Sequence, residues 1–172
     1  LQVIEDVETH LVASNATAIT MCLVTNYSMD AVKEMADVVY SFKDIAAPIS
    51  SGSFKNKGMI VLPCSMKTLA GIANSFSENL LLRAADVVLK DRRRLVIAPR
   101  ETPLHLGHLR MMVQVTEMGA IIAPPMPAFY HQPKTIDDIV NQTVNRVLDL
   151  MGIELEVDLF KRWQGGEAAS HG

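Results

Sequence analysis

The sequence is poor in cysteine, in aromatic side chains and in long apolar runs. Its 172 residues include two cysteines, Cys22 and Cys64, so a disulfide framework is excluded and a reducing, cytoplasmic setting is expected. No apolar run approaches the roughly 20 residues that a membrane-spanning helix requires. We therefore expect a cytoplasmic protein with no membrane partner.

An excess of charge of one sign is also lacking. Lysine and arginine together number 16, against 19 for aspartate and glutamate, which leaves a net charge of −3. Because nucleic-acid binding requires a basic surface, this balance argues against nucleic acid as a partner. Apolar residues make up 49% of the chain and aromatic residues only 5%, and there are ten methionines, so we expect a core of aliphatic and methionine side chains. The length predicts a single domain over residues 1–172.

What is present is an alternation of short apolar runs with helical patterns. The apolar runs predict strands at 8–14, 58–63, 94–99 and 119–124. The helical patterns cover 28–40, 66–76, 78–94, 104–119 and 135–152, with a loop at 43–58 and a flexible tail at 164–172. Strands that are apolar on both faces and separated by helices are typical of a parallel sheet covered on both sides. The sequence therefore predicts a three-layer α/β fold with a doubly wound parallel sheet, of the flavodoxin or Rossmann kind.

Chemically active side chains follow the carboxyl ends of the predicted strands, where ligands gather in such sheets. Ser14 ends the first strand, and Ser65 follows the second. Arg100 and Glu101 follow the third, and Tyr130 comes soon after the fourth. One edge of the sheet is thus expected to collect hydroxyl groups, an arginine beside a glutamate, and a tyrosine.

The segment Ser65-Met66-Lys67-Thr68 lies where a strand gives way to a helix. Its first backbone amides and its two hydroxyl groups can bind an anion at the positive end of the helix dipole. Ser65 can equally serve only as the cap of that helix. The two interpretations are equally weighted by this segment alone.

The Arg100-Glu101 pair also has two interpretations. A structural ion pair is the commoner role for such neighbours, whereas a carboxyl group beside a bound phosphate can move a proton. Arg83 and Lys90 are seven residues apart, so they share one helical face and can point at the same ligand. The basic run 90–94 is more typical of a solvated helix end.

Other candidate sites have weaker support. His105 and His108 have helical spacing but no third ligand nearby, so no zinc site is expected. Cys64 has apolar neighbours, which favours packing over nucleophilic catalysis. Trp163 can stack on a ligand, although an anchor for the C-terminal segment is the commoner role. No metal site is expected.

Several longer stretches match a known pattern. They read ISSGSF (49–54), PCSMKTLAGIA (63–73), RAADVVLKDRRRLVIAPRETPLHLGHLRMM (83–112), MGAIIAPPMPAFYHQP (118–133) and a closing RW (162–163). In this order they resemble the UbiX-type flavin prenyltransferases over roughly residues 46–165. Members of the same family are also named as the B-type component of phenolic or hydroxyarylic acid decarboxylase, or as 3-octaprenyl-4-hydroxybenzoate carboxy-lyase.

The resemblance implies a metal-independent prenyltransferase. Such an enzyme joins a dimethylallyl group from dimethylallyl monophosphate to N5 and C6 of reduced FMN, and the prenylated FMN serves UbiD-type decarboxylases. It also implies a homododecamer built from trimers, with sites shared between subunits. One alternative is a non-catalytic FMN-binding accessory subunit of an aromatic acid decarboxylase. Another is an FMN-dependent cysteine decarboxylase of similar fold, which needs a catalytic histidine near the flavin and a family-specific asparagine motif, and the segment PCSMKT offers neither.

Matched residue by residue, the resemblance also implies site roles. The FMN-binding positions are Ser14, Ser65, Met66, Lys67, Thr68 and Arg100. The prenyl phosphate is held by Tyr130, Arg146 and Lys90, with Trp163 in the apolar surround. The catalytic positions of the phosphate cluster are Arg83, Lys90 and Glu101.

The resemblance leaves out the start of the family pattern. Relatives normally begin with a strand and a glycine-rich loop that grips FMN, and this sequence starts after that unit. We therefore expect the N-terminal strand–helix unit to be absent from the chain, and the chain as written to bind FMN weakly.

Overall fold

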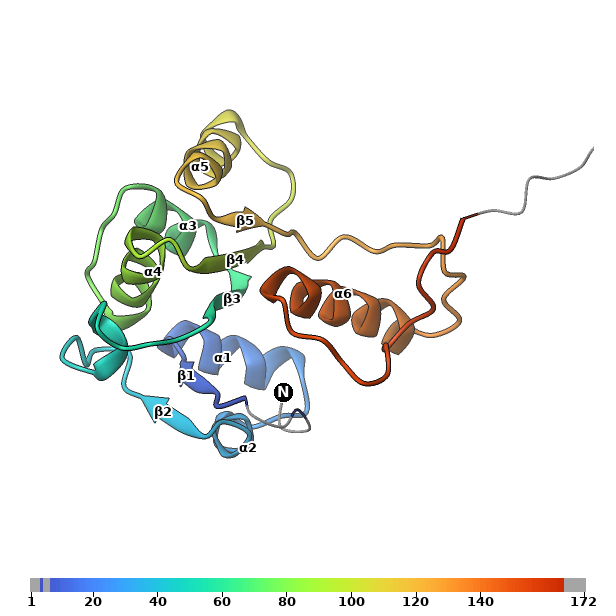
Figure 1. The fold of residues 1–172 in the computed structure, drawn as a ribbon, viewed down its shortest axis with the longest axis horizontal. Helices are drawn as coiled ribbons and strands as arrows, with labels where there is room; N and C mark the ends of the chain where they lie inside the picture. Colours follow the sequence, from blue (N-terminus) through green and yellow to red (C-terminus); the bar gives the residue numbers. More distant parts are fainter. Residues whose placement is uncertain (1–3, 5–6, 166–172) are drawn as a thin grey trace, which may run out of the picture.

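The structure, a computed structural model, describes residue 4 and residues 7–165 (Figure 1). Its strands are β1 (His10–Val12), β2 (Val38–Tyr40), β3 (Gly58–Cys64), β4 (Arg94–Pro99) and β5 (Ile121–Ile122). Its α-helices are α1 (Asn15–Val24), α2 (Met29–Glu34), α3 (Met66–Ala73), α4 (Leu80–Lys90), α5 (Leu106–Glu117) and α6 (Ile136–Met151). A short 3₁₀ helix, η1, covers Pro48–Ser50. Most of the expected tail, residues 166–172, lies outside the described residues.

Parallel pairing organises the described strands. β1 pairs with β2, and β4 lies between β3 and β5. The predicted α/β fold with parallel strands is therefore confirmed, although the hydrogen bonds among the described residues form two sheets in place of one. Gly58 begins β3 at a φ of 147°, and a side chain there would collide with the carbonyl group of Arg94 on β4. Only glycine lets the two strands start side by side.

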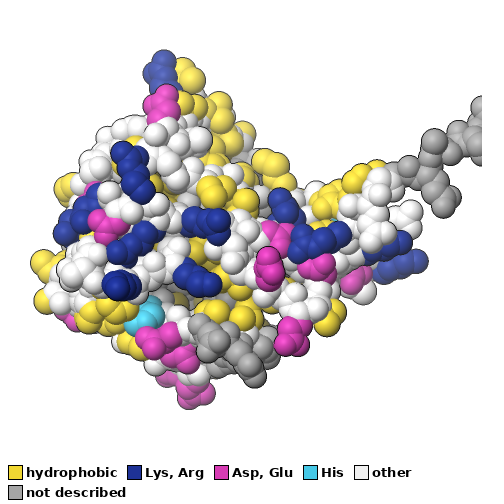
Figure 2. All heavy atoms as spheres, viewed as in Figure 1, with side chains coloured by type: hydrophobic (Ala, Val, Ile, Leu, Met, Phe, Trp, Pro, Cys, Tyr) yellow, Lys and Arg dark blue, Asp and Glu magenta, His cyan; other side chains and the backbone are white. Residues whose placement is uncertain are grey.

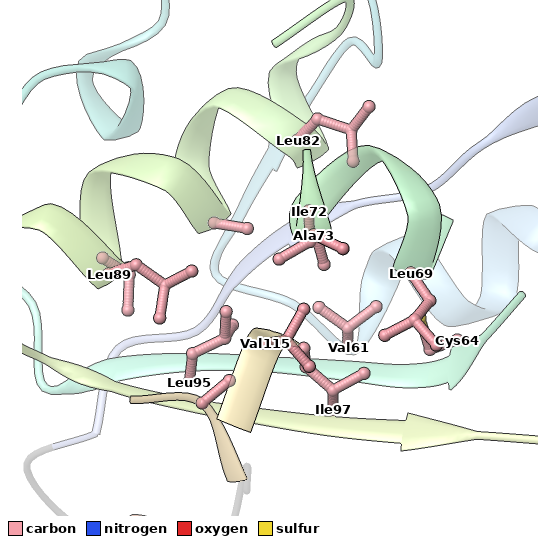
Figure 3. Packing of buried hydrophobic residues seen from close by; sticks show 13 residues of the cluster. Val61, Cys64, Leu69, Ile72, Ala73, Leu82, Leu89, Leu95, Ile97 and Val115 are labelled. Carbon is pink, nitrogen blue, oxygen red and sulfur yellow. The ribbon is translucent and has the colours of Figure 1, made fainter. Parts of the chain in front are cut away.

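Successive residues of β4 point to opposite faces of the larger sheet and define its layers. Leu95 and Ile97 pack with buried side chains of α3, α4 and α5 on one face (Figure 3). Val96, which lies between them, packs against Val147 and Met151 of α6 on the other face. The larger sheet is thus the middle of three layers, as the sequence predicts.

Side-chain caps begin the helices close to the predicted positions. Ser65, Asn79 and Thr135 each accept a hydrogen bond from a backbone N–H of the first turn. Thr135 and Asp138 form a reciprocal capping box, so α6 begins where the sequence predicts. Of the helices in the described residues, none has both the length and the apolar character for crossing a membrane.

Two N-terminal segments differ from the predictions. The helix expected over 28–40 ends at Glu34, and Val38–Tyr40 form strand β2. The carboxylate of Asp37 accepts hydrogen bonds from the N–H and the hydroxyl of Thr9, which brings the β-branched residues that follow alongside β1. Helix α1 lies in a stretch for which the sequence predicts no helix. Its apolar side chains are spread around the helix, so the sequence shows no apolar stripe there, and none of its residues is buried.

Truncation of Leu69 tests the core beneath α3. Leu69 is fully buried (0% exposed), so Leu69→Ala should lower the free energy of unfolding by about 3 kcal/mol, measured by denaturant titration. Leu23 on α1 is 79% exposed and supplies the matched control, for which Leu23→Ala should change the value by less than about 0.5 kcal/mol. Equal losses for the two variants would contradict this packing.

Candidate active site

The carboxyl end of β3 forms the first part of the site. The N–H of Thr68 donates to the Ser65 hydroxyl (3.2 Å), and the Ser65 hydroxyl donates to that of Thr68 (3.1 Å). Ser65 is therefore a helix cap. The cap still leaves the amides of Met66 and Lys67 without a hydrogen bond among the described residues. Capping and anion binding are thus compatible at this helix start, and neither excludes the other.

The carboxyl end of β4 lies beside it. The N–H of Arg100 donates to the carbonyl group of Cys64 (3.4 Å), which ties the ends of the two paired strands together. Glu101 is exposed, and its carboxylate accepts a hydrogen bond from the N–H of Thr102 (3.0 Å). The ion pair that is the commoner interpretation of Arg100-Glu101 is wrong for this structure, because the carboxylate is turned to the backbone.

We call residues 64–68 and 99–101 the cradle. The side chains of Lys67 and Arg100 are exposed, and neither takes part in any ion pair recorded for the described residues. Unpaired cations, free backbone amides and hydroxyl groups together suit an anionic ligand. The residues present therefore fit the phosphate-bearing flavin that the sequence resemblance implies.

Ser14 lies at a second strand end. Its hydroxyl accepts the N–H of Thr17 (3.1 Å) and lies 2.9 Å from the Thr17 hydroxyl, which repeats the arrangement of Ser65 with Thr68. Beside it is a cavity of about 370 Å³ at the carboxyl ends of β1 and β2. Its lining includes Ser14, Asn15, Lys33, Tyr40, Ser41 and Lys43. Apart from Ser14, the residues of this lining are not predicted from the sequence, although the spacing Ser-x-x-Thr at 14–17 and again at 65–68 is a usable signal.

Arg83 and Lys90 share one face of α4, as predicted, and in this chain they face the loop at 50–54. The Nε of Arg83 donates to the carbonyl group of Ser50 (3.1 Å), and its Nη1 pairs with Asp86 (3.1 Å). Lys90 pairs with Asp91 (2.8 Å) beside Gly52. Arg93 also donates to carbonyl groups of this loop, so part of the basic run 90–94 has a structural role in place of the solvated one expected.

Lys90 and the cradle lie at opposite ends of β4. Lys90 ends α4 just before β4 begins, whereas Arg100 follows the last residue of the strand. Six residues of strand span about 20 Å. One copy of the chain therefore does not bring Lys90 to Arg100.

The remaining predicted residues lie on residues 124–165, which we call the arm. Figure 1 shows the arm leaving the end of β5 and extending to one side of both sheets. The Tyr130 hydroxyl accepts a hydrogen bond from the Gln142 side chain (3.1 Å), and the Trp163 ring meets the Tyr130 ring edge to face at 6.4 Å. Both rings remain exposed, at 49% and 67%. Trp163 is thus an anchor on Tyr130 that still presents an apolar surface.

Residues 153–163, which we call the strap, run back along α6. Asn145 is 1% exposed, and its side-chain oxygen Oδ1 accepts a hydrogen bond from the N–H of Leu159 (2.7 Å). Arg162 donates through two nitrogens to Asp149 (2.8 and 2.9 Å) and also pairs with Asp158. On the face that Figure 2 shows, acidic and basic side chains lie next to one another over α6. The buried Asn145 amide and the ion pairs of Arg162 thus hold the strap in place.

The structure divides the predicted site residues into separate groups. The cradle holds Ser65–Thr68, Arg100 and Glu101, α4 carries Arg83 and Lys90, and the arm carries Tyr130, Arg146 and Trp163. Among residues 4 and 7–165, no recorded hydrogen bond or ion pair joins the arm residues to the cradle.

The candidates given little weight have other roles here. Burial raises the pKa of the Cys64 thiol to about 12, so a reactive thiolate is disfavoured. The Nδ1 of His105 accepts from the N–H groups of Gly107 and His108 and caps α5. Within the described part of the chain, no cluster of three or more histidine, cysteine, aspartate or glutamate side chains can hold a metal ion.

The strap should detach only in acid. Hydrogen bonds from Arg162 hold the pKa of Asp149 and of Asp158 below the usual range. A lowered pKa in the folded state stabilises the fold above the ordinary value of about 3.9, and this contribution is lost as the pH falls through the lowered value. The fluorescence of Trp163, the one tryptophan in the sequence, should stay constant down to about pH 4 and change below it.

Lys161→Gln changes a strap charge that takes part in no ion pair with the residues that the structure describes, and it should give the same pH profile. A transition near pH 6.5 would contradict the assignment and point to a histidine, since that is the ordinary histidine range, about 6.5.

Comparison with known proteins identifies the family. A family profile described as Flavoprotein matches residues 2–148. The flavin prenyltransferase UbiX of Escherichia coli K12 is 59% identical over 165 residues, which are 96% of this chain and 87% of that protein. Among solved structures, a dodecameric FMN-dependent UbiX-like decarboxylase from Escherichia coli O157:H7 has a TM-score of 0.92 and 52% identity, and the match covers 96% of this chain and 88% of that one.

A second solved structure, AnUbiX (PadA1) in complex with FMN and dimethylallyl pyrophosphate, has a TM-score of 0.89 and 51% identity. The match covers 94% of this chain and 85% of that one. These likenesses extend over the cradle, α4 and most of the arm. The chain therefore belongs to the UbiX flavin prenyltransferase family, and it is a flavoprotein enzyme.

Proposed function

We propose that this chain transfers a dimethylallyl group from dimethylallyl monophosphate to N5 and C6 of reduced FMN. The observation that carries the proposal is the cradle, where amides and cations that have no partner within residues 4 and 7–165 lie at the ends of two paired strands. Its relatives support the choice, since one is named a flavin prenyltransferase and another is a complex with FMN and a dimethylallyl ester.

The cradle and the neighbouring strand end are assigned to the flavin. The residues proposed to hold FMN are Ser14, Ser65, Met66, Lys67, Thr68 and Arg100. Bound reduced FMN supplies the electron-rich ring that the prenyl carbon joins. The chain's own part is to fix the flavin through amides, hydroxyl groups and cations that are already positioned by the strand ends.

The cations of α4 and the arm are assigned to the prenyl phosphate. When an allylic ester loses its phosphate, negative charge develops on the departing group. Arg83, Lys90 and Arg146 can offset that charge by charge-assisted hydrogen bonds, and guanidinium groups do so bidentately. The Tyr130 hydroxyl adds a neutral hydrogen bond, and the exposed Trp163 ring gives the prenyl chain an apolar surface.

The transfer of a proton to the departing phosphate is assigned to Glu101. Thr102 holds one oxygen of this exposed carboxylate, and the other oxygen has no recorded partner among the described residues. From this position the carboxyl group can pass a proton to the departing phosphate and orient the arginines around it.

One copy of the chain does not assemble these groups, so we propose that neighbouring copies complete the site. Lys90 lies about 20 Å along β4 from the cradle. The arm extends to one side of both sheets, although the C-terminal turns of α6 pack on β4 (Figure 1). A solved relative is dodecameric. A homododecamer built from trimers would allow the arm and the α4 face of one copy to cover the cradle of another.

The product and its recipient belong to the same proposal. Prenylated FMN would pass to a UbiD-type decarboxylase in the cytoplasm, where the free cysteines of this chain would remain reduced.

Incubation with reduced FMN and dimethylallyl monophosphate tests the function. Mass spectrometry should detect a flavin that is heavier by one prenyl unit. Glu101→Gln should slow its formation by about 100-fold while the affinity for FMN stays unchanged, because a proton-transfer group is lost and no flavin contact is. Glu117→Gln, at an exposed glutamate on α5, should behave like the wild type.

If FMN binds and no heavier flavin forms, the chain is a non-catalytic accessory subunit and the proposal fails. An unchanged rate in Glu101→Gln would make Glu101 a structural residue.

Mixing of two inactive variants tests the shared site. Arg100→Ala removes a cradle cation, and Arg146→Ala removes an arm cation. Oligomers that contain both variants in equal amounts should recover about a quarter of the wild-type rate, because an intact cradle then meets an intact arm in that fraction of sites. Co-expression with two different tags and measurement of prenyl transfer in the doubly tagged fraction gives the answer. If the rate does not recover, the site lies within one copy.

A further inference from the structure

Asp149 on α6 lies between two arginines. Its Oδ2 accepts from the Nη1 of Arg146 (2.9 Å), and the Nη1 and Nη2 of Arg162 donate to its two oxygens (2.9 and 2.8 Å). Asp149 is mostly buried, with 19% of its side chain exposed, whereas half of the Arg146 side chain is exposed. The carboxylate is thus fixed by the strap and holds one nitrogen of Arg146.

We propose that Arg162 and Asp149 are positioning residues for Arg146, which they orient toward the phosphate of dimethylallyl monophosphate. The inference rests on the proposed function, because it takes Arg146 as a phosphate ligand. Neither Arg162 nor Asp149 is assigned a contact with substrate or flavin.

The geometry favours positioning over simple helix stabilisation. Arg146 and Asp149 are three residues apart on α6, and such an exposed pair alone contributes little, because two long side chains lose their freedom to form it. Here the carboxylate is already immobilised by the two nitrogens of Arg162 and by the side-chain amide of Asn145. Arg146 therefore loses only its own freedom when it binds, and its other nitrogens remain available.

The charges are also consistent with phosphate binding. A lone carboxylate beside Arg146 would repel a phosphate, whereas Arg162 neutralises Asp149. The hydrogen bonds from Arg162 keep the pKa of Asp149 low, so the carboxylate stays ionised and retains Arg146 through the neutral pH range. Arg162 thus fixes the Asp149 carboxylate, and that carboxylate in turn orients Arg146.

Asp158 provides a matched control. It also pairs with Arg162, through Nε and Nη2, but it has no recorded contact with Arg146. Asp158→Asn therefore removes one of the two carboxylate charges that hold Arg162, and it leaves the Asp149 carboxylate and its hydrogen bond from Arg146 in place. Asp149→Asn removes the charge that holds Arg146 and loosens the strap at the same time. The difference between the two variants isolates the effect on Arg146.

The experiment measures binding of dimethylallyl monophosphate by calorimetry to protein loaded with oxidised FMN, together with the KM and kcat of prenyl transfer. Asp149→Asn and Arg162→Gln should each weaken binding and raise KM by about tenfold, the loss of about 1.4 kcal/mol, with kcat much less affected. Asp158→Asn should stay within about twofold of the wild type in both quantities. Arg162→Lys keeps the positive charge but loses the two-nitrogen contact with Asp149. Its binding affinity and KM should lie between those of Arg162→Gln and Asp158→Asn.

A second measurement separates positioning from a general loss of structure. In an Arg146→Ala background, Asp149→Asn should weaken binding no further, because a residue that acts through Arg146 has nothing left to orient. Trp163 fluorescence reports whether the strap stays docked in each variant, since Trp163 follows Arg162 directly and packs on Tyr130.

The possible results distinguish a failure of this inference from a failure of the proposed function. Equal losses in Asp149→Asn and Asp158→Asn, or a further loss on the Arg146→Ala background, would overturn the inference and leave the proposed function standing. If wild-type protein neither binds nor consumes dimethylallyl monophosphate, the proposed function fails and the inference fails with it.

Discussion

The parallel pairing of β3 with β4 is the constraint on which the candidate site depends. Because both strands end at the same edge, Ser65 and Arg100 become neighbours although 35 positions separate them, and the Arg100 N–H to Cys64 carbonyl bond fixes that proximity. A helix begins directly after β3 and directs its first amides toward that edge. The buried side chains of β4 that hold α3, α4, α5 and α6 against the sheet keep this edge rigid.

The separation of the cationic groups has a physical consequence. In a single copy, Arg83 and Arg93 donate to carbonyl groups of the loop at 50–54, and Lys90 pairs with Asp91. Among the described residues, Arg100 and Lys67 of the cradle are in no ion pair. A strong cluster of cations within one chain would repel itself in the absence of ligand. Delivery of the phosphate-binding cations from neighbouring copies, as proposed, would bring them together only in the assembled oligomer. The exposed Tyr130 and Trp163 rings of the arm are consistent with such an assembly.

The arm gains its order from polar contacts more than from apolar packing. In the C-terminal turns of α6, Val147 and Met151 pack on β4. In the same turns, Asn145 and Asp149 hold the strap through hydrogen bonds from Leu159 and Arg162. Such directional contacts specify one arrangement of the charged side chains, which apolar packing does not do. The same contacts that hold the strap thereby set the orientation of Arg146.

The sequence by itself determined the α/β class, the bounds of β4 and α6, and the identity of the cradle, because these follow from local apolar runs, caps and motif order. It did not reveal α1 or β2, since α1 has no apolar stripe and β2 is set by contact with β1 and with Thr9. Only the tertiary structure decided that Arg83 and Arg93 reach the loop at 50–54 and that Arg162 reaches Asp149. These are distances between residues that the chain brings together by folding, and no local pattern encodes them.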